Sequence, residues 1–572
     1  MTRRVVVLLS ALFLLFALLP TWYEIAHRGR LKPIREFELV HNFPTDYNFY
    51  LSRIREGLEG RWTVVEKYTS EPHRGSLIQE FYLLTGQVGR VAGVEPHDAW
   101  RVYHAARIIL GLALLLMIGE YCRKSFEGSI KGEQILAFLL VVTASSWPVV
   151  VHEAGGLQFY GYMRWWSVMD PLLRIPFVPH FLIGQIFILY IIATASEASF
   201  RTYPLRWLWA GMWSLVLGFV FPPALVVAIL ALIVQAVLEL YSNKKYQKRL
   251  SLWIYGSVFP RMTVGLIGIP SLLYIQMMTR ADPWSRLLTH HVLHPTTYDP
   301  WEYILAIGPV LPLGLLGLVL AIGRKERRMM SLVSWVTAWA VFGIFSYPFT
   351  QMFPLRFSQL GPHIPLGILT AYVFYVLAKR AEVANENFDG SPVGLPALFS
   401  SLIPNTITLI PIFIILLGLG SMYSTYLAQK DFVDHKIRAD IPLVPTGTYV
   451  MYPLKDFVAA LRYLEANTKR SEIVLSETTA GNYIPAYSGN TVFVGQDNTL
   501  HAEEKWVLVR TFFSGMMKSN QARDFMEKNH LRYVFFGPQE KDDGGIDDLR
   551  KVYPFLEEMY KNEYVTIYRV NH

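Results

Sequence analysis

The chain has 572 residues, of which 52% are apolar and only 17% are charged. Soluble domains of this length carry more charge, so the composition indicates a polytopic membrane protein and argues against a soluble enzyme. The formal net charge of +8 does not indicate nucleic-acid binding, because the Lys and Arg residues cluster between apolar runs, as topology signals do. The only cysteine, Cys122, allows no internal disulfide.

Eleven apolar runs are long enough to cross a bilayer, which takes about 17–25 mostly apolar residues. The first run is expected to be a retained anchor rather than a signal peptide, because the segment Leu19–Tyr23 lacks a small-residue cleavage site. Pro222 and Pro223 supply a turn between the fifth and sixth runs. The predicted spans are 4–20, 105–121, 135–151, 179–197, 206–221, 223–241, 262–278, 302–323, 330–347, 361–378 and 399–423.

Basic clusters occupy every second boundary between these spans. By the positive-inside rule, this pattern predicts a cytoplasmic amino terminus in a multi-pass protein of the cell (inner or plasma) membrane. The odd number of spans then predicts an extracytoplasmic tail. The clusters are Arg3/Arg4, Arg123/Lys124/Lys131, Arg201/Arg206, Lys244/Lys245/Lys248/Arg249, Arg324/Lys325/Arg327/Arg328 and Lys379/Arg380.

Two domains are expected, a transmembrane domain over residues 1–423 and an extracytoplasmic α/β domain over 424–572. The long first outer loop, 21–104, belongs to the transmembrane domain in this division, and further outer segments are predicted at 152–178, 279–301 and 348–360. The tail alternates helical and strand-like patterns, which is typical of an α/β domain. Its predicted helices are 456–467, 501–513 and 546–560, and its predicted strands are 472–476, 491–494, 533–536 and 564–570.

The stretch TDYNFYLSRIREG, Thr45 to Gly57, begins soon after the first span. Its apolar residues recur at helical spacing with Arg53 and Glu56 on other faces, which predicts a helix lying flat in the membrane interface. Thr45 is the predicted N-cap, so Asp46 falls in the first turn, where the helix dipole favours the ionised form that a general base needs. The alternative is an aspartate that only begins a helix, and spacing alone favours this alternative.

Further along the first loop, YTSEPHRG brings Glu71, His73 and Arg74 within four positions. Such a group can bind a phosphate or orient a base. A solvated turn beside a proline is the competing interpretation, and it is the better one for this motif taken alone.

The third outer segment contains His290, His291 and His294. Histidines at i and i+4 share a helix face, which suits a metal. However, Pro295 ends the helix, and no Glu stands where a metalloprotease helix needs one. A histidine cluster that contacts phosphate or lipid headgroups is therefore favoured over a zinc site.

The link before the tenth span, YPFTQMFPLRFSQLGPH, contains Arg356, Gln359 and His363. Their spacing of i, i+3 and i+7 predicts one shared helix face at the membrane boundary. A guanidinium there can pair bidentately with a phosphate or pyrophosphate. An arginine that snorkels to lipid headgroups is an equal alternative.

Together these pieces resemble the GT-C glycosyltransferase superfamily, polytopic enzymes that take sugars from polyprenyl-phosphate carriers on the outer face of the membrane. The resemblance spans nearly the whole chain, and its motifs are short and loose. More distantly, the tail resembles the soluble domain of oligosaccharyltransferase catalytic subunits, although SETTAGNY lacks the tryptophans and aspartate of their motif. The segments that carry the resemblance are TDYNFY, YLSRIREGLEGRW, YTSEPH, PFTQMFPLRFSQLGPHIPLG and VLSETTAGNYIPAYSGNTVFVGQDNTL.

The resemblance implies an inverting glycosyltransferase with a polyprenyl-phosphate sugar donor and a glycan, lipid or protein acceptor. It makes Asp46 the catalytic base, with Glu71 as a second acidic candidate. Arg356 is the first candidate for the donor phosphate, followed by His290, His291, His73 and Arg74, with Gln359 and His363 nearby. No cofactor is expected. A divalent metal is not favoured, because Asp46 begins Asp-Tyr-Asn rather than Asp-X-Asp.

Two other classes of protein remain as alternatives. A transporter or flippase of lipid-linked precursors would show internal repeats and charged or broken helices at mid-membrane, whereas the ionisable groups here gather outside the spans. A catalytically inactive protein that binds envelope polymers would keep most of the same residues. Binding of a polyprenyl-phosphate sugar without turnover would distinguish it from an enzyme.

Overall fold

A computed structural model of the protein describes residues 1–41, 43–129, 131–153, 156–350, 354–386, 396–445 and 451–571. The chain folds into two compact units, each built from segments that are distant in the sequence. Unit 1 comprises Met1–Leu19, Arg107–Leu273 and Thr296–Ala428, and unit 2 comprises Pro20–Ala106, Tyr274–Pro295 and Gln429–His572. The first loop and the tail thus share one unit, a grouping that differs from the expected division at residue 423.

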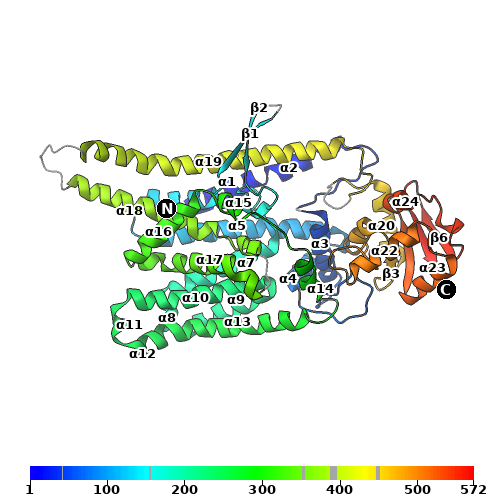
Figure 1. Ribbon diagram of the computed structural model, residues 1–572, viewed down its shortest axis with the longest axis horizontal. Helices are drawn as coiled ribbons and strands as arrows, with labels where there is room; N and C mark the ends of the chain where they lie inside the picture. Colours follow the sequence, from blue (N-terminus) through cyan, green and yellow to red (C-terminus); the bar gives the residue numbers. More distant parts are fainter. Residues whose placement is uncertain are drawn as a thin grey trace. The chain divides into compact units, whose positions relative to one another are not determined.

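Unit 1 is almost entirely helical, and its long helices α10, α13 and α17 run alongside one another in Figure 1. Among the described residues, four helices contain residues of both units, namely α2, α5, α13 and α19. The helices are α1 (Arg3–Ala17), α5 (Ala99–Ser125), α6 (Lys131–Val142), α7 (Pro179–Ser196), α8 (Ala198–Thr202), α9 (Pro204–Val220), α10 (Pro222–Ser242), α11 (Lys244–Lys248), α12 (Leu250–Trp253), α13 (Phe259–Met278), α15 (Pro300–Ile307), α16 (Val310–Gly323), α17 (Met330–Thr350), α18 (His363–Glu386) and α19 (Pro396–Arg438). Shorter elements are η3 (Ser167–Met169), the π-helical η4 (Ile254–Val258), η5 (Arg327–Met329), η6 (Pro354–Leu360) and the antiparallel strands β1 (Pro148–Glu153) and β2 (Gly156–Gly161).

Within the described residues, seven helical stretches are long and apolar enough to cross a membrane, and two bent helix pairs raise this number to nine. The protein is therefore a multi-pass membrane protein. One bent pair is α15 and α16, which meet at 76° inside the predicted span 302–323. The number of eleven spans stays a prediction.

The predicted span 135–151 is wrong in its second half. Helix α6 ends at Val142, and residues from Pro148 form strand β1. The residue before a proline disfavours the helical conformation, so Pro148 argues against a helix at this point. The side chain of Ser146 accepts a hydrogen bond from the Tyr162 N–H at 2.8 Å, which ties the start of β1 to the end of β2.

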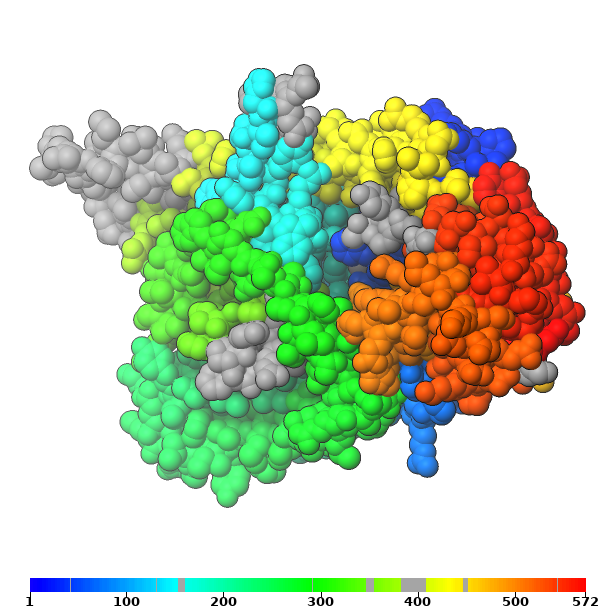
Figure 2. Space-filling model, turned by 45° about the vertical axis from the view of Figure 1, so that its right-hand side comes forward, coloured from blue at the N-terminus to red at the C-terminus, as the bar shows by residue number. Residues whose placement is uncertain are grey.

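Unit 2 contains a five-stranded mixed sheet in the order β4-β3-β5-β7-β6, and its tail forms one body coloured orange to red in Figure 2. Strands β4, β3 and β5 are parallel, and β7 is antiparallel to both β5 and β6. The strands are β3 (Ile473–Leu475), β4 (Thr491–Val492), β5 (Leu531–Phe536), β6 (Leu556–Lys561) and β7 (Thr566–Val570). The helical elements are α2 (Leu19–His27), η1 (Arg28–Arg30), α3 (Pro44–Leu58), α4 (Glu80–Val91), η2 (Pro96–Asp98), α14 (Arg286–Leu293), α20 (Lys455–Asn467), α21 (Thr478–Tyr487), α22 (Ala502–Phe513), α23 (Ser519–Lys528), α24 (Pro538–Gly544) and η7 (Leu549–Lys551).

Both faces of this sheet are covered, because successive side chains of a strand point to opposite sides. On β5, Val534 and Phe536 enter a core formed with α22 and α23, whereas Phe535 enters a second core. The second core contains residues of α20 and α21 together with Phe49 and Tyr68 of the first loop. The first loop therefore supplies part of the core of the tail.

The predicted helix 546–560 is also wrong. Its first part forms η7, and Leu556–Lys561 form strand β6, which pairs with β7. Pro554 interrupts the apparent helical pattern. The other predicted helices and strands of the tail are present within a few residues of their expected bounds, while α21, α23 and α24 were not expected.

Candidate functional site

Asp46 lies in the first turn of α3, as the sequence predicts, and its side chain is partly exposed. The predicted N-cap is wrong: Phe43 occupies the N-cap position without a side-chain capping bond, and Pro44 begins the helix. Proline suits this first position because its missing N–H would have no intrahelical partner there. The positive end of the helix dipole stabilises a carboxylate at Asp46.

Helix α21 packs directly against α3, and it contains the SETTAGNY segment. The Asn482 side chain donates to the Thr45 C=O at 3.2 Å, next to Asp46 in the chain, and its Oδ1 accepts from the Asn48 Nδ2 at 2.8 Å. Its backbone C=O accepts from the Tyr68 hydroxyl at 3.1 Å. Asn482 therefore fixes the first turn of α3 from the tail, a role that the sequence analysis missed although it had singled out this segment.

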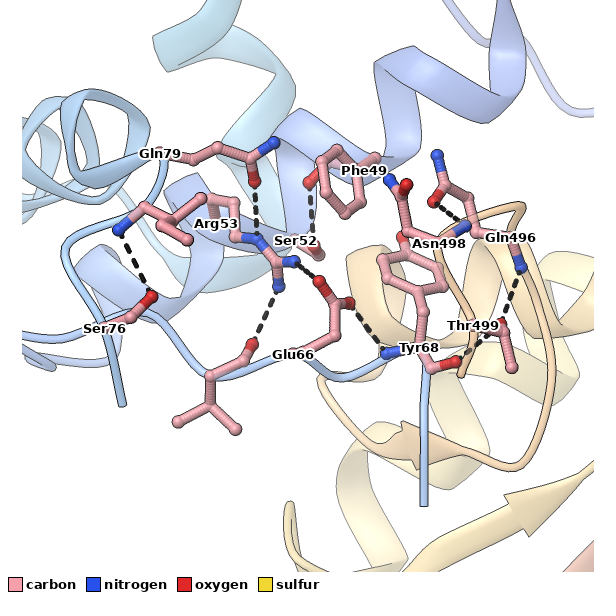
Figure 3. Close-up of polar contacts among 12 residues, drawn as sticks. Phe49, Ser52, Arg53, Glu66, Tyr68, Ser76, Gln79, Gln496, Asn498 and Thr499 are labelled. Atoms are coloured by element: carbon pink, nitrogen blue, oxygen red, sulfur yellow. Dashed lines mark hydrogen bonds and ion pairs between the residues drawn. The ribbon is translucent and has the colours of Figure 1, made fainter. Parts of the chain in front are cut away.

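The middle of α3 is held by a buried ion network rather than exposed to solvent or lipid (Figure 3). The Arg53 guanidinium, which is 0% exposed, donates to Glu66 Oε2 at 2.6 Å and to the Val65 C=O at 2.8 Å. It also contacts Glu56 Oε1 at 3.3 Å and lies 4.5 Å from the centre of the Phe49 ring. The prediction of a helix lying flat in the interface is wrong, because α3 is buried along nearly its whole length.

Glu71 forms an ion pair with Lys505 of α22, with Nζ 2.7 Å from Oε1. Burial raises the pKa of Glu71, but hydrogen bonds from Lys505 and Thr69 outweigh burial, so the pKa lies below its ordinary value. Lys505 itself is buried and lies 4.7 Å from the centre of the Phe493 ring. Glu71 is thus an ionised anchor between the first loop and the tail, and its catalytic role stays a prediction.

His73 has both ring nitrogens engaged with the backbone. Its Nε2 accepts from the Glu66 N–H at 2.8 Å, and its Nδ1 lies 2.7 Å from the Glu71 C=O, to which it donates. This pattern defines the neutral Nδ1–H tautomer. His73 therefore shapes the loop and has no ring nitrogen left for a phosphate, whereas Arg74 is exposed at the surface.

The histidines on and after α14 face acidic residues of the tail. Nε2 of His290 lies 4.0 Å from Asp497 Oδ2, and Nε2 of His294 lies 3.7 Å from Glu503 Oε1. Arg286, at the start of α14, binds Glu503 at 2.6 Å. Burial lowers the pKa of His290. The nearby carboxylates repel an anion, which weakens the phosphate hypothesis here, and the side chain of His291 lies outside the described residues.

In unit 1, Arg356 and Gln359 lie on η6, and Arg356 is partly buried. The predicted helix face shared with His363 is wrong, because the chain turns at Gly361 with φ of 72° before α18 begins at His363. Gln359 is buried, and its backbone C=O accepts from Gln185 Nε2 at 2.8 Å.

Two small cavities in unit 1 are lined by both Arg174 and His363. The Arg174 guanidinium is buried and donates to the carbonyls of Val141 and Val142 at 3.2 and 2.9 Å, at the carboxyl end of α6. A cation at that end of a helix is favoured by the helix dipole. Arg174 lies in an irregular segment after η3, where no hydrophobic periodicity in the sequence could have indicated it.

Over the part of the chain that the structure describes, no group of three or more His, Cys, Asp or Glu residues is arranged to hold a metal ion. The described residues do include groups suited to acid–base and electrostatic chemistry. A carboxylate at a helix start can accept a proton, and arginines near the apolar helices can bind an anion.

No protein-family model matches the chain, and no curated protein matches it. Solved structures of the archaeal oligosaccharyltransferase AglB from Archaeoglobus fulgidus are similar to it. The complex with an inhibitory peptide and a dolichol-phosphate matches 97% of this chain and 72% of its own, at 12% identity and a TM-score of 0.52. The apo form matches 97% and 73%, at 13% identity and a TM-score of 0.52. The form tethered to an acceptor peptide with the NVT sequon matches 94% and 69%, at 13% identity and a TM-score of 0.51.

This likeness confirms the GT-C resemblance at the level of the fold. The similar region covers 97% of the chain and so includes residues of both units.

Proposed function

We propose that the protein is an inverting glycosyltransferase that moves a sugar from a polyprenyl-phosphate-linked donor to an acceptor on the outer face of the membrane. The observation that supports this proposal most strongly is the fold likeness over 97% of the chain to an oligosaccharyltransferase solved with a dolichol-phosphate. The departure of SETTAGNY from the oligosaccharyltransferase motif argues against a protein sequon as acceptor.

The proposed topology has eleven spans, a cytoplasmic amino terminus and an extracytoplasmic unit 2. Its support is the distribution of Lys and Arg between the apolar runs. Because nucleotide sugars belong to the cytoplasm, an enzyme that works on the outer face needs a lipid-linked donor.

Asp46 is the proposed general base. Its carboxylate removes the proton from an acceptor hydroxyl as the hydroxyl oxygen attacks the anomeric carbon of the donor. A new glycosidic bond forms while the bond from the anomeric carbon to the phosphate oxygen breaks, which inverts the configuration. The proton remains on Asp46, and the electron pair leaves with the polyprenyl phosphate.

The leaving phosphate gains negative charge, so a fixed cation lowers the barrier. Arg356 is the proposed partner, because its guanidinium can bind two phosphate oxygens at once. His290 and His291 are weaker candidates because carboxylates of the tail face α14. His73 is no longer proposed, because both its ring nitrogens already have backbone partners.

The acceptor side is proposed to include α21. Asn482 bonds to the C=O of the residue before Asp46, so a substrate that contacts α21 would be aligned with the base. In this proposal Glu71 and Lys505 hold the first loop against the tail instead of taking part in proton transfer.

The test replaces Asp46 by Asn, which keeps the shape and removes the basic carboxylate. Transfer of a labelled sugar from a polyprenyl-phosphate donor in proteoliposomes should fall by about 10²–10⁴-fold, the range for general base catalysis. The matched control is Asp524→Asn, which alters an exposed carboxylate on α23. Undiminished transfer by Asp46→Asn, at normal expression and melting temperature, would remove Asp46 as the base.

A further inference from the structure

Helix α4 is apolar on two opposite faces, and within the described part of the chain only one of these faces packs closely against protein. One face contacts α3 so closely that a Cβ added at Gly86 would meet the Ile54 C=O at 2.1 Å. On the other face Leu84, Val88 and Val91 are 45%, 71% and 90% exposed. Their spacing of i, i+4 and i+7 forms a continuous stripe along the helix. An exposed apolar stripe of this kind marks a surface that something covers.

A tryptophan adds to this stripe. Trp62, in the segment after α3, is 69% exposed. The neighbouring Arg61 C=O accepts a hydrogen bond from the Gln87 side chain of α4, and the Arg90 guanidinium of α4 lies over Gly60. Trp62 therefore belongs to the same surface as α4. Tryptophan is enriched where proteins meet the polar–apolar boundary of a membrane.

The connection of α4 to the next helix limits how far it can lie from the bilayer. The candidate membrane span Pro96–Ser125 begins shortly after α4 ends at Val91. The intervening residues reach at most about 3.3–3.6 Å each when fully extended. Trp100, 37% exposed, lies at the start of this span. The end of α4 is thus tied by a short segment to the place where the chain enters the membrane.

The charges around the stripe also suit a membrane surface. Arg61, Arg90 and Arg101 have exposed side chains beside the apolar positions. Arg101 also pairs with Asp98 at 3.2 Å, and Glu95 is exposed in the connecting segment. Cationic residues next to an apolar stripe are typical of helices that lie in the membrane interface, where they meet anionic headgroups.

We propose that the outward face of α4, together with Trp62 and Trp100, lies in the interfacial layer of the membrane and binds phospholipid headgroups and the upper acyl chains. This interface belongs to α4 and not to α3, the helix that carries Asp46 and that packs against the opposite face of α4. By binding lipid, α4 fixes the height of α3 above the bilayer. The inference does not depend on the proposed activity.

The single cysteine of the chain provides the experiment. Cys122 is 0% exposed, so Val88→Cys introduces the one readily labelled thiol, at a position that tolerates substitution because its side chain is exposed. The full chain is labelled with a fluorophore and placed in vesicles of phosphatidylcholine and phosphatidylglycerol. Quenching is then measured with nitroxide lipids and, separately, with iodide in the water. Met516→Cys, 81% exposed in the tail, is the aqueous control, and Ile233→Cys, 57% exposed on the candidate membrane span α10, is the lipid control.

The proposal predicts that nitroxides near the headgroup end of the acyl chain quench the Val88 label several-fold more than the Met516 label, while iodide quenches it less. Iodide quenching equal to that at Met516 would overturn the proposal, because the stripe would then face water. Protection from both quenchers would overturn it as well, because a protein surface would cover the stripe. Sugar transfer is not part of the readout, so failure here leaves the proposed function standing.

Discussion

At the scale of residues, the polar side chains of α3 show what a local pattern can and cannot predict. The helical spacing correctly predicted the helix and the position of Asp46 in its first turn. It could not predict that Arg55 is buried, because its partner Glu465, 2.5 Å away, lies 410 residues further along the chain. His73 is a similar case, since the backbone groups that engage its ring cannot be recognised in YTSEPHRG. Whether a charged side chain is buried depends on its partners in space, and a local sequence pattern does not show where those partners lie.

Glu540, on α24 of the tail, is a buried titrating group outside the membrane helices. It is 1% exposed and accepts hydrogen bonds from the backbone N–H groups of Glu477 at 2.8 Å and Gly537 at 3.0 Å. Burial, with a smaller contribution from the Glu477 carboxylate, raises the pKa of Glu540 from 4.5 to about 8. The folded protein therefore binds a proton at this site that the unfolded chain releases above its ordinary pKa.

A pH-dependent stability follows from this shift. Because the folded pKa is raised, the stabilisation is complete below pH 4.5 and is lost as the pH rises to about 8. The loss amounts to at most about 5 kcal/mol, since one pKa unit corresponds to about 1.4 kcal/mol. Glu540→Gln should reduce the difference in melting temperature between pH 5 and pH 8, measured in detergent micelles. The exposed Glu504→Gln should leave that difference unchanged, and an equally large difference in both variants would contradict the assignment to Glu540.

At the scale of elements, the hydrophobic pattern predicted helices and strands correctly where one face of the element is buried. It predicted them wrongly where a proline interrupts the segment or where a neighbouring strand pairs with it. Strand β5 and helix α20 have the expected type and nearly the expected bounds. Residues 546–560 look helical by composition but end in β6, because β7 offers them an open edge for pairing. The predicted face of Arg356, Gln359 and His363 failed at Gly361, whose positive φ breaks the helical path.

The crossing of α3 and α4 depends on two glycines that allow the backbones to approach. A Cβ at Gly86 would meet the Ile54 C=O at 2.1 Å, and a Cβ at Gly57 would meet the Leu83 C=O at 2.0 Å. Backbone atoms cannot move aside as a flexible side chain can, so the helices must separate. The contact is therefore specific for glycine at both positions.

Gly86→Ala should accordingly destabilise unit 2 by about 1–3 kcal/mol, the usual cost of overpacking a close contact. Thermal unfolding followed by the accessibility of buried residues of α3 measures the effect. Gly29→Ala is the matched control, because a Cβ there has no atom within 4 Å. A melting temperature for Gly86→Ala equal to that of Gly29→Ala would show that the two helices do not pack as described.

At the scale of the whole molecule, unit 2 is assembled from three segments that are far apart in the sequence. Phe49 and Tyr68 of the first loop complete a core of the tail, and Thr499 of the tail donates to the Tyr68 C=O at 2.7 Å. The alternation of helical and strand-like patterns along the tail could identify it as an α/β domain. It could not show that the first loop folds with the tail, because no local pattern records which distant segment fills a core.

A chain that ends at Ala428 should therefore lose the structure of the first loop while its membrane helices remain. Arg53 and Arg55 are 0% and 1% exposed in the full chain, so trypsin should cut after them only in the shortened chain. Mass spectrometry of the fragments released from membranes provides the measurement. Arg61, whose side chain is 44% exposed, serves as a site that is cut in both proteins. Continued protection of Arg53 and Arg55 would mean that the first loop folds without the tail.

The assembly of unit 2 from three separate segments also determines when it can fold during biosynthesis. More than three hundred residues separate the end of the first segment of unit 2 from the start of its last. At a synthesis rate of about 5–20 residues per second, the ribosome needs roughly 15–65 s to make them. During that interval the nascent first loop has no tail to fold with, and it can make only contacts within itself, such as the Arg53–Glu66 pair and the crossing of α3 and α4. A cell that makes this protein must therefore protect an incomplete loop for tens of seconds after it emerges.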